Sequence, residues 1–237
     1  MRGGEKMKQL LLSITVIFSI MLLPMRGVGE QKVNMLPYKL IAELPEANIQ
    51  LLAKEEYGWL RDFQIKVGQK TQNFPEWESM LVTKQTKPQL FSVDVTGDGI
   101  EEIIVFLIKA RGNGLYKNEV HVLEKTTNGE KLLVNEIIIE DPRAVILKNM
   151  KMKEMDNGIE LIIDDIHALI PYDGSKQDAN KIKLSIDHFL KYVIDKNELK
   201  AIMLIERKDN TYLGSLIVQY EYKNGILQGK QIEFVRH

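Results

Sequence analysis

The segment "DVTGDGIEE", residues 94–102, gathers four acidic side chains and two glycines between two apolar runs. Hard cations such as calcium take about six to eight oxygen ligands, and short loops supply these oxygens from alternating positions, with a glycine at the turn. Side-chain and carbonyl oxygens alternate in this way along the segment. It therefore predicts a metal site, with calcium as the cofactor, formed by Asp94, Thr96, Asp98, the carbonyl group of Ile100, and Glu102.

A turn without a metal explains the same residues. Asp94 and Thr96 can accept hydrogen bonds from backbone N–H groups, and Gly97 and Gly99 can adopt positive φ. Carboxylates crowded at one tip repel one another at neutral pH, however, and this repulsion favours a cation. An EF-hand is excluded, because its twelfth loop position needs a bidentate Glu, and the residue at that position is Val105.

The spacing resembles the strand-loop-strand calcium motif of FG-GAP and VCBS-type repeats, which runs Asp-x-(Asp/Asn)-x-Asp-Gly-x-x-Asp before an apolar strand. The chain departs from this motif at Thr96, where Asp or Asn is usual, and at Glu102, where Asp is usual. The glycine-rich bend "RGNG" at 111–114 is similar to that of exported single-motif VCBS-like proteins of spore-forming bacteria. The resemblance covers about residues 90–123. It implies calcium bound at a turn of an extracellular interaction or adhesion protein.

The runs beside the acidic segment, "QLFSVDV" and "EIIVFLIKA", predict the two strands of a hairpin. In the second run, Ile103, Val105 and Leu107 would point one way. Ile104, Phe106 and Ile108 would point the other way. A strand that is apolar on both faces is usually covered on both sides, so the loop is expected to be mounted on a rigid base.

Further hairpins are predicted where strand-like runs flank turn segments, which are "TTNG" at 126–129, "DNG" at 156–158, "KDNT" at 208–211 and "KNG" at 223–225. For 44–68 we favour a hairpin that turns at Tyr57 and Gly58, although a helix in 44–56 also fits. The prolines in 74–80 and 84–89 indicate connecting segments, and "IDHFLKYVI" at 186–194 suggests a helix. The predicted fold class is mainly β, formally all-β or α+β, with antiparallel hairpins around one core and one or two short helices.

The amino terminus resembles a signal peptide. Basic residues at Arg2, Lys6 and Lys8 precede fourteen uncharged, mostly apolar residues at 10–23, which is short for a spanning helix of about 20 residues. Cleavage after Gly29 would leave 30–237 as an extracytoplasmic β-rich domain. An uncleaved anchor, and with it a membrane-tethered accessory protein, is the alternative. The chain has no cysteine, which excludes a lipid-modified cysteine, disulfides and thiolate zinc sites.

The charge balance bears on the partner. Removing 1–29 leaves a net charge of about −4, which argues against nucleic acid, because phosphate binding depends on Lys and Arg. We expect a protein or cell-wall partner, with membrane contact only through an uncleaved amino terminus.

No catalytic motif stands out in the sequence. The segment "DDIHALIPYD" holds Asp164, Asp165, His167 and Asp173, and we interpret it as a strand end with solvated carboxylates. His121 alternates with Val120 and Val122 and is interpreted as a cross-strand surface residue.

The leading hypothesis from the sequence is an exported binding or structural module without catalysis. The alternative enzyme is an envelope hydrolase that uses carboxylates such as Asp164, Asp165 or Glu102 as acid and base.

Overall fold

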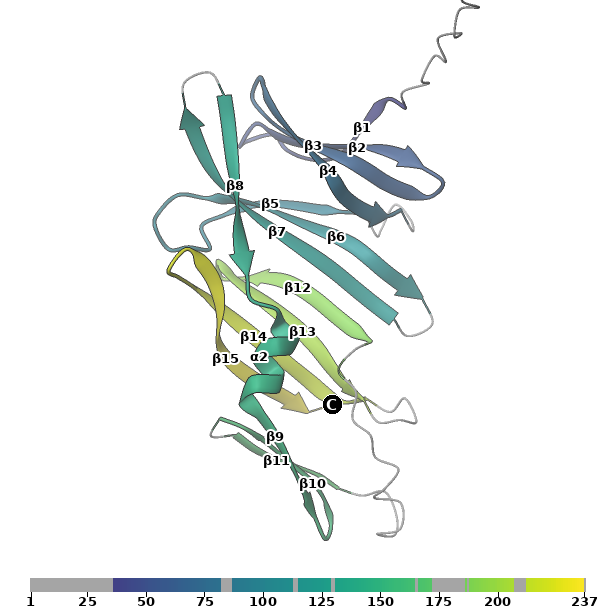
Figure 1. Ribbon diagram of the computed structural model, residues 1–237, viewed down its shortest axis with the longest axis vertical. Coiled ribbons are helices and arrows are strands. Elements are labelled where there is room, and N and C mark those ends of the chain that lie inside the picture. Colours follow the sequence, from purple (N-terminus) through teal and green to yellow (C-terminus); the bar gives the residue numbers. More distant parts are fainter. Residues whose placement is uncertain are drawn as a thin grey trace, which may run out of the picture. The chain divides into compact units, whose positions relative to one another are not determined.

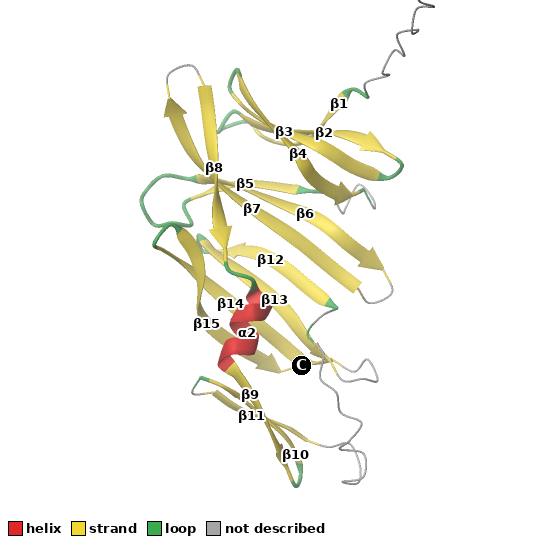
Figure 2. Ribbon diagram, in the orientation of Figure 1, coloured by secondary structure: helices red, strands yellow, loops and turns green. Residues whose placement is uncertain are grey.

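The computed structural model describes residues 36–81, 87–112, 115–128, 131–164, 166–171, 186, 188–206 and 212–236, without the side chains of 126–133. The predicted signal peptide lies outside these residues, as do Asp165, Asp173 and the second half of the "RGNG" bend. The described chain is mainly β, as the sequence predicts (Figure 2).

A four-stranded antiparallel sheet, in the order β1-β2-β3-β4, opens the described chain (Figure 1). Its strands are β1 (Tyr38–Leu44), β2 (Ile49–Glu56), β3 (Trp59–Val67) and β4 (Lys70–Met80). The hairpin predicted for 44–68 is confirmed as β2 and β3, and no helix forms in 44–56. Tyr57 and Gly58 both have positive φ, at 49° and 80°, which matches the twist that a two-residue hairpin turn requires.

The expectation that 74–80 connects two elements is wrong, because these residues belong to β4. Pro75 cannot donate to a strand ladder, so proline within a sheet is confined to edges and bulges. The strand β4 is an edge strand, and its register with β3 shifts between Arg61 and Phe63. Pro75 falls at this irregularity, which explains how a strand accommodates it.

An eight-stranded sheet follows, in the order β12-β13-β14-β15-β8-β7-β6-β5. Its strands are β5 (Gln89–Val93), β6 (Glu102–Gly112), β7 (Leu115–Asn128), β8 (Lys131–Ile139), β12 (Phe189–Asp195), β13 (Glu198–Glu206), β14 (Tyr212–Lys223) and β15 (Ile226–Arg236). The strands of the hairpins predicted within this sheet pair as expected, and the predicted turn at 208–211 lies outside the described residues. A third sheet, in the order β11-β10-β9, consists of β9 (Met150–Met155), β10 (Gly158–Ile163) and β11 (Ile166–Pro171).

Two short parallel pairings connect the hairpins of the large sheet. The strand β12 pairs with β7 at Phe189 and Leu190, and β15 pairs with β8 at Ile226 and Leu227. The first of these pairings brings the edge strand β12 back to β7. The strands β7, β8, β15, β14, β13 and β12 therefore form a closed ring, with β5 and β6 continuing the sheet beyond it.

The helix suggested for 186–194 is wrong, because Phe189–Asp195 forms β12. Tyr192 lies opposite Ala201 of β13, and both are buried, so pairing within the ring outweighs the local helical preference. The helix α2 (Pro142–Asn149) was not predicted. Its signal was present, since Asp141 accepts a hydrogen bond from the N–H of Arg143 as the N-cap and Pro142 follows it.

The buried residues form two clusters rather than the one core that the sequence suggested. The strand β6 contributes to both. Ile103, Val105 and Leu107 pack in the cluster with the four-stranded sheet. Ile104 and Phe106 pack in the other cluster, with residues of β12 to β15, of α2 and of the third sheet. The prediction that β6 is covered on both faces is therefore confirmed, and the acidic loop ends at a strand that is packed on both sides.

Two polar side chains of β4 join the small sheet to the large one. The amide of Gln72 bonds the backbone of Val134 in both directions, at 3.0 and 3.2 Å. The hydroxyl of Ser79 accepts from the N–H of Ile108 at 3.0 Å and donates to its carbonyl at 3.4 Å. These bonds satisfy backbone groups of β8 and β6 that would otherwise be buried without partners.

Candidate functional site

The acidic loop connects β5 to β6, and Asp94 holds its turn together. Asp94 Oδ1 accepts from the N–H of Gly97 at 2.7 Å, and Oδ2 accepts from the N–H of Gly99 at 2.9 Å. Both glycines have positive φ, at 80° and 86°. Burial raises the pKa of Asp94, but the hydrogen bonds from Gly97 and Gly99 outweigh it, so the pKa lies below its ordinary value.

The other predicted ligands are also engaged by the loop itself. The hydroxyl of Thr96 lies 3.4 Å from Asp94 Oδ1, and Asp98 Oδ1 accepts from the N–H of Ile100 at 2.7 Å. The side chain of Ile100 is exposed. The next residue, Glu101, is exposed and accepts from the hydroxyl of Ser92 at 2.7 Å.

Glu102 differs from the other carboxylates of the loop because it is only 1% exposed. Its Oε2 atom accepts from the N–H groups of Val95 and Thr96, at 2.9 and 3.3 Å. Burial raises the pKa of Glu102 above its ordinary value, and the charges of Asp98 and Asp94 raise it further. Glu102 is therefore a buried carboxylate under like-charge repulsion from the two aspartates.

The loop thus matches calcium in the chemistry of its donors, because carboxylate and hydroxyl oxygens are the ligands of a hard cation. The arrangement, however, is that of a hydrogen-bonded turn. Over the described part of the chain, no three His, Cys, Asp or Glu side chains are placed to hold one ion. The structure brings Asp94, Asp98 and Glu102 within electrostatic range of one another and directs their oxygens at backbone N–H groups.

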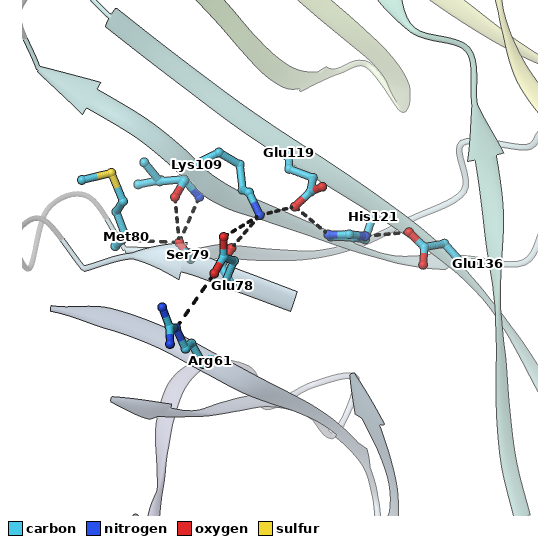
Figure 3. A network of polar contacts seen from close by, with 9 residues as sticks. Arg61, Glu78, Ser79, Met80, Lys109, Glu119, His121 and Glu136 are labelled. Atoms are coloured by element: carbon cyan, nitrogen blue, oxygen red, sulfur yellow. Dashed lines mark hydrogen bonds and ion pairs between the residues drawn. The ribbon is translucent and has the colours of Figure 1, made fainter. Parts of the chain in front are cut away.

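A second region, not anticipated from the sequence, is a chain of charged side chains that crosses from the small sheet to the large one (Figure 3). Glu78 of β4 lies between Arg61 of β3, at 3.9 Å, and Lys109 of β6, at 3.7 Å. Lys109 also lies 3.2 Å from Glu119 of β7. Positive and negative side chains therefore alternate along this row of contacts.

His121 of β7 continues this chain. Its Nδ1 atom lies 2.6 Å from Glu136 Oε1, and its Nε2 atom lies 3.5 Å from Glu119 Oε2. The longer of the two contacts is an ion pair rather than a hydrogen bond, and Nε2 has no hydrogen-bond partner. Burial lowers the pKa of His121, but Glu119 and Glu136 together outweigh it, so the pKa lies above its ordinary value.

The interpretation of His121 as a surface residue is wrong, because it is only 7% exposed. It pairs with Val105 of β6 on the face that the small sheet covers. The alternation of His121 with Val120 and Val122 correctly placed it on the opposite face of β7 from these valines. The sequence carried no signal that the small sheet would cover this face.

A groove of about 650 Å³ lies beside His121, between β7, β8 and the start of β12. It exists because pairing along one edge of β7 is interrupted. The strand β12 pairs with β7 as far as Lys117, and β8 begins to pair with it at Val122. Among the described strands, none covers this edge over residues 118–121.

Asn118 lines the groove and is only 6% exposed. Its Oδ1 atom has no hydrogen-bond partner. A buried polar atom without a partner costs about 1–3 kcal/mol. Such atoms are rare in native proteins, so Asn118 marks a site where a hydrogen-bonding group from another molecule would be accepted.

The residues considered for acid and base catalysis do not converge. Glu102 begins β6, whereas Asp164, with φ of 49°, occupies the turn between β10 and β11 in another sheet. His167 is exposed and lies 3.0 Å from Glu160 across the same hairpin. Asp164 and His167 are both exposed, as the sequence indicated, but they belong to the hairpin of β10 and β11 rather than to a single strand end.

Comparisons with known proteins found no match to a family model, a curated protein or a solved structure. In the part of the chain that the structure describes, no helix is long and apolar enough to cross a membrane.

Proposed function

We propose that the chain is an exported, non-catalytic module that acts at the cell surface or in the medium, and that its acidic loop is a weak calcium site. Export is supported by the basic start and the apolar run at 10–23. The partner would be a protein or a cell-wall component, since the acidic charge balance disfavours nucleic acid.

The observation that carries the calcium proposal is the burial of Glu102 within range of the charges of Asp94 and Asp98. A buried carboxylate is unfavourable unless it is paired, and two hydrogen bonds from N–H groups compensate it only in part. Carboxylate oxygens have lone pairs to spare beyond the bonds from Gly97, Gly99 and Ile100. A calcium ion at the tip would share these oxygens and cancel the repulsion.

The consequence for function is mechanical. The strand β6 is packed on both faces, and the loop leads directly into it. Calcium would therefore extend the rigidity of β6 to the exposed tip. With three carboxylates and Thr96 where an acid is usual, we expect weak binding, with a Kd of about 10⁻⁴ to 10⁻³ M. Such affinity suits the calcium concentrations outside cells.

A calcium titration followed by thermal unfolding tests the proposal on the chain from Glu30 onward. At ten times the Kd, calcium should stabilise the fold by about 1.4 kcal/mol, which raises the Tm by about 3–5 °C. The variant Asp98→Asn should lose most of this gain, and the matched change Asp195→Asn, on an exposed aspartate of β12, should keep it. An unchanged Tm in millimolar calcium would contradict the site.

Export is tested independently by amino-terminal sequencing. A mature chain that begins at Glu30 in the culture medium supports secretion. A chain that keeps residues 1–29 and stays with the membrane fraction favours the tethered accessory protein instead.

A further inference from the structure

The interrupted edge of β7 leaves particular backbone groups facing the groove. The N–H of Tyr116 donates to the carbonyl of His188, just before β12, at 2.9 Å, so it points to the edge where the groove lies. Successive residues of a strand direct their N–H and C=O groups to alternate sides. The N–H of Asn118 points to the same edge and is engaged by Leu190 through the parallel pairing of β12 with β7. The C=O group of Asn118 and the N–H and C=O groups of Val120 therefore face the groove.

The gap has a definite length. The two neighbouring strands leave four residues of β7 uncovered, 118–121, which correspond to about 13 Å at about 3.3 Å per residue. The gap is too short for another full strand, and it accommodates two or three extended residues.

The walls of the groove favour an uncharged ligand. Its apolar surface comes from Val120, Ile137, Leu190 and other aliphatic side chains. Its charged residues are of both signs, namely Lys109 and Lys117 on one hand and Glu119, Glu136 and Asp141 on the other. The protonated form of His121 brings the two signs into balance.

We propose that this groove binds a short extended stretch of neutral peptide, whose amide groups pair with the backbone of Asn118 and Val120 and with the free Oδ1 of Asn118. A peptide offers donors and acceptors in alternation, as this edge of β7 does, and it adds to the sheet in the way that β-strand addition works in other peptide-binding domains. The apolar walls receive the side chains. The occupant is a peptide from another molecule, and the proposal is independent of export and of the calcium loop.

The probe is a tripeptide with both ends blocked, N-acetyl-Ala-Val-Ala-amide, titrated into the full chain labelled with ¹⁵N. We expect saturable shifts of the amide signals of residues 117–121. A probe methylated on the valine nitrogen lacks one donor and should bind about tenfold more weakly, as expected for the loss of one hydrogen bond.

The variant Asn118→Leu removes the free oxygen at similar side-chain volume. It should weaken binding of the tripeptide about tenfold, while resistance to unfolding stays the same or increases, because a buried atom without a partner is removed. The matched control is Asn135→Leu, the same change at an exposed position of the neighbouring strand β8 outside the groove.

If Asn118→Leu does not fold, a second variant still tests whether the groove binds the tripeptide. Ile138 is 68% exposed and lines the groove, so Ile138→Trp fills the space without entering the core and should abolish binding. The proposal is overturned if the amide signals of residues 117–121 do not respond to millimolar tripeptide. It is equally overturned if Ile138→Trp binds as well as the unaltered chain.

Discussion

The imidazole of His121 stacks on the indole of Trp77, with ring centroids 3.9 Å apart and an angle of 21° between the planes. Trp77 stacks in turn on Phe74, at 4.0 Å, within the core of the small sheet. The protonated imidazole is thus attracted to an aromatic face while Glu119 and Glu136 supply the opposite charge. One ionisable residue therefore connects the packing of the two sheets.

The contacts of His121 with Glu119 and Glu136 predict that stability depends on pH near neutrality. The pKa of His121 is raised in the folded chain, so the native state holds its proton more tightly than the unfolded state. The stabilisation is fully present below the unfolded pKa of about 6.5 and is lost as the pH rises through the folded pKa. Urea unfolding at a series of pH values should therefore show a free energy of unfolding that falls from about pH 6 upward.

The variant His121→Phe keeps the ring stack and removes the titration, so its stability should vary less across this range. His167→Gln, which alters an exposed histidine in another hairpin, is the control and should keep the slope of the unaltered chain. A slope that survives in His121→Phe would assign the pH dependence to another group.

The buried carboxylate of Glu102 predicts that removing its charge has opposite effects on the Tm without calcium and with calcium. Its pKa is raised, so its negative charge disfavours the metal-free fold at neutral pH. Glu102→Gln should therefore unfold at a Tm equal to or higher than that of the unaltered chain in the presence of a chelator. In excess calcium the order should reverse, because the variant has one carboxylate fewer for the ion.

The adjacent change Glu101→Gln serves as the control for Glu102→Gln. Glu101 is exposed and bonds Ser92, so the loss of its charge should alter neither the Tm in chelator nor the response to calcium. Equal behaviour of the two glutamine variants would show that the burial of Glu102 has no electrostatic consequence.

A close approach between β15 and α2 predicts a coupled pair. A Cβ atom on Gly229 would lie 2.5 Å from Cγ1 of Val145, which is buried. We expect Gly229→Ala to destabilise the fold by about 1–3 kcal/mol through overpacking. Val145→Ala removes both Cγ atoms and leaves its Cβ as the nearest atom of that side chain, at 3.2 Å. The double variant should therefore cost less than the sum of the two single changes. Urea unfolding of the four proteins measures this, and additive costs would contradict it.

Much of the fold was predictable because its signals are local. Alternation of apolar residues and the turn residues at Tyr57, Gly58 and "KNG" are properties of short segments, and they identified the hairpins. The two apolar faces of β6 predicted correctly that it lies between two layers. The composition of the acidic loop, with glycines at positive φ, also followed from its own residues.

Other features were decided by contacts between distant segments. Residues 186–194 became a strand because Tyr192 packs opposite Ala201, and Pro75 was accommodated by a bulge against β3. A local pattern carries no information on such partners. The ring of strands depends on the parallel pairings of β12 with β7 and of β15 with β8, which no turn signal announces.

The features of the candidate sites also separate into those set by local sequence and those set by distant contacts. The sequence by itself determined that the chain is mainly β and that a loop of carboxylates and glycines precedes a strand apolar on both faces, because residue type and spacing control turns and periodicity. Tertiary structure alone decided that Glu102 is buried within range of the charges of Asp94 and Asp98. It also decided that His121 is enclosed between two sheets, and that no described strand pairs over residues 118–121 with the edge of β7 that faces away from β6. Burial and pairing are set by the elements that pack against a residue, and those elements lie far away in the chain.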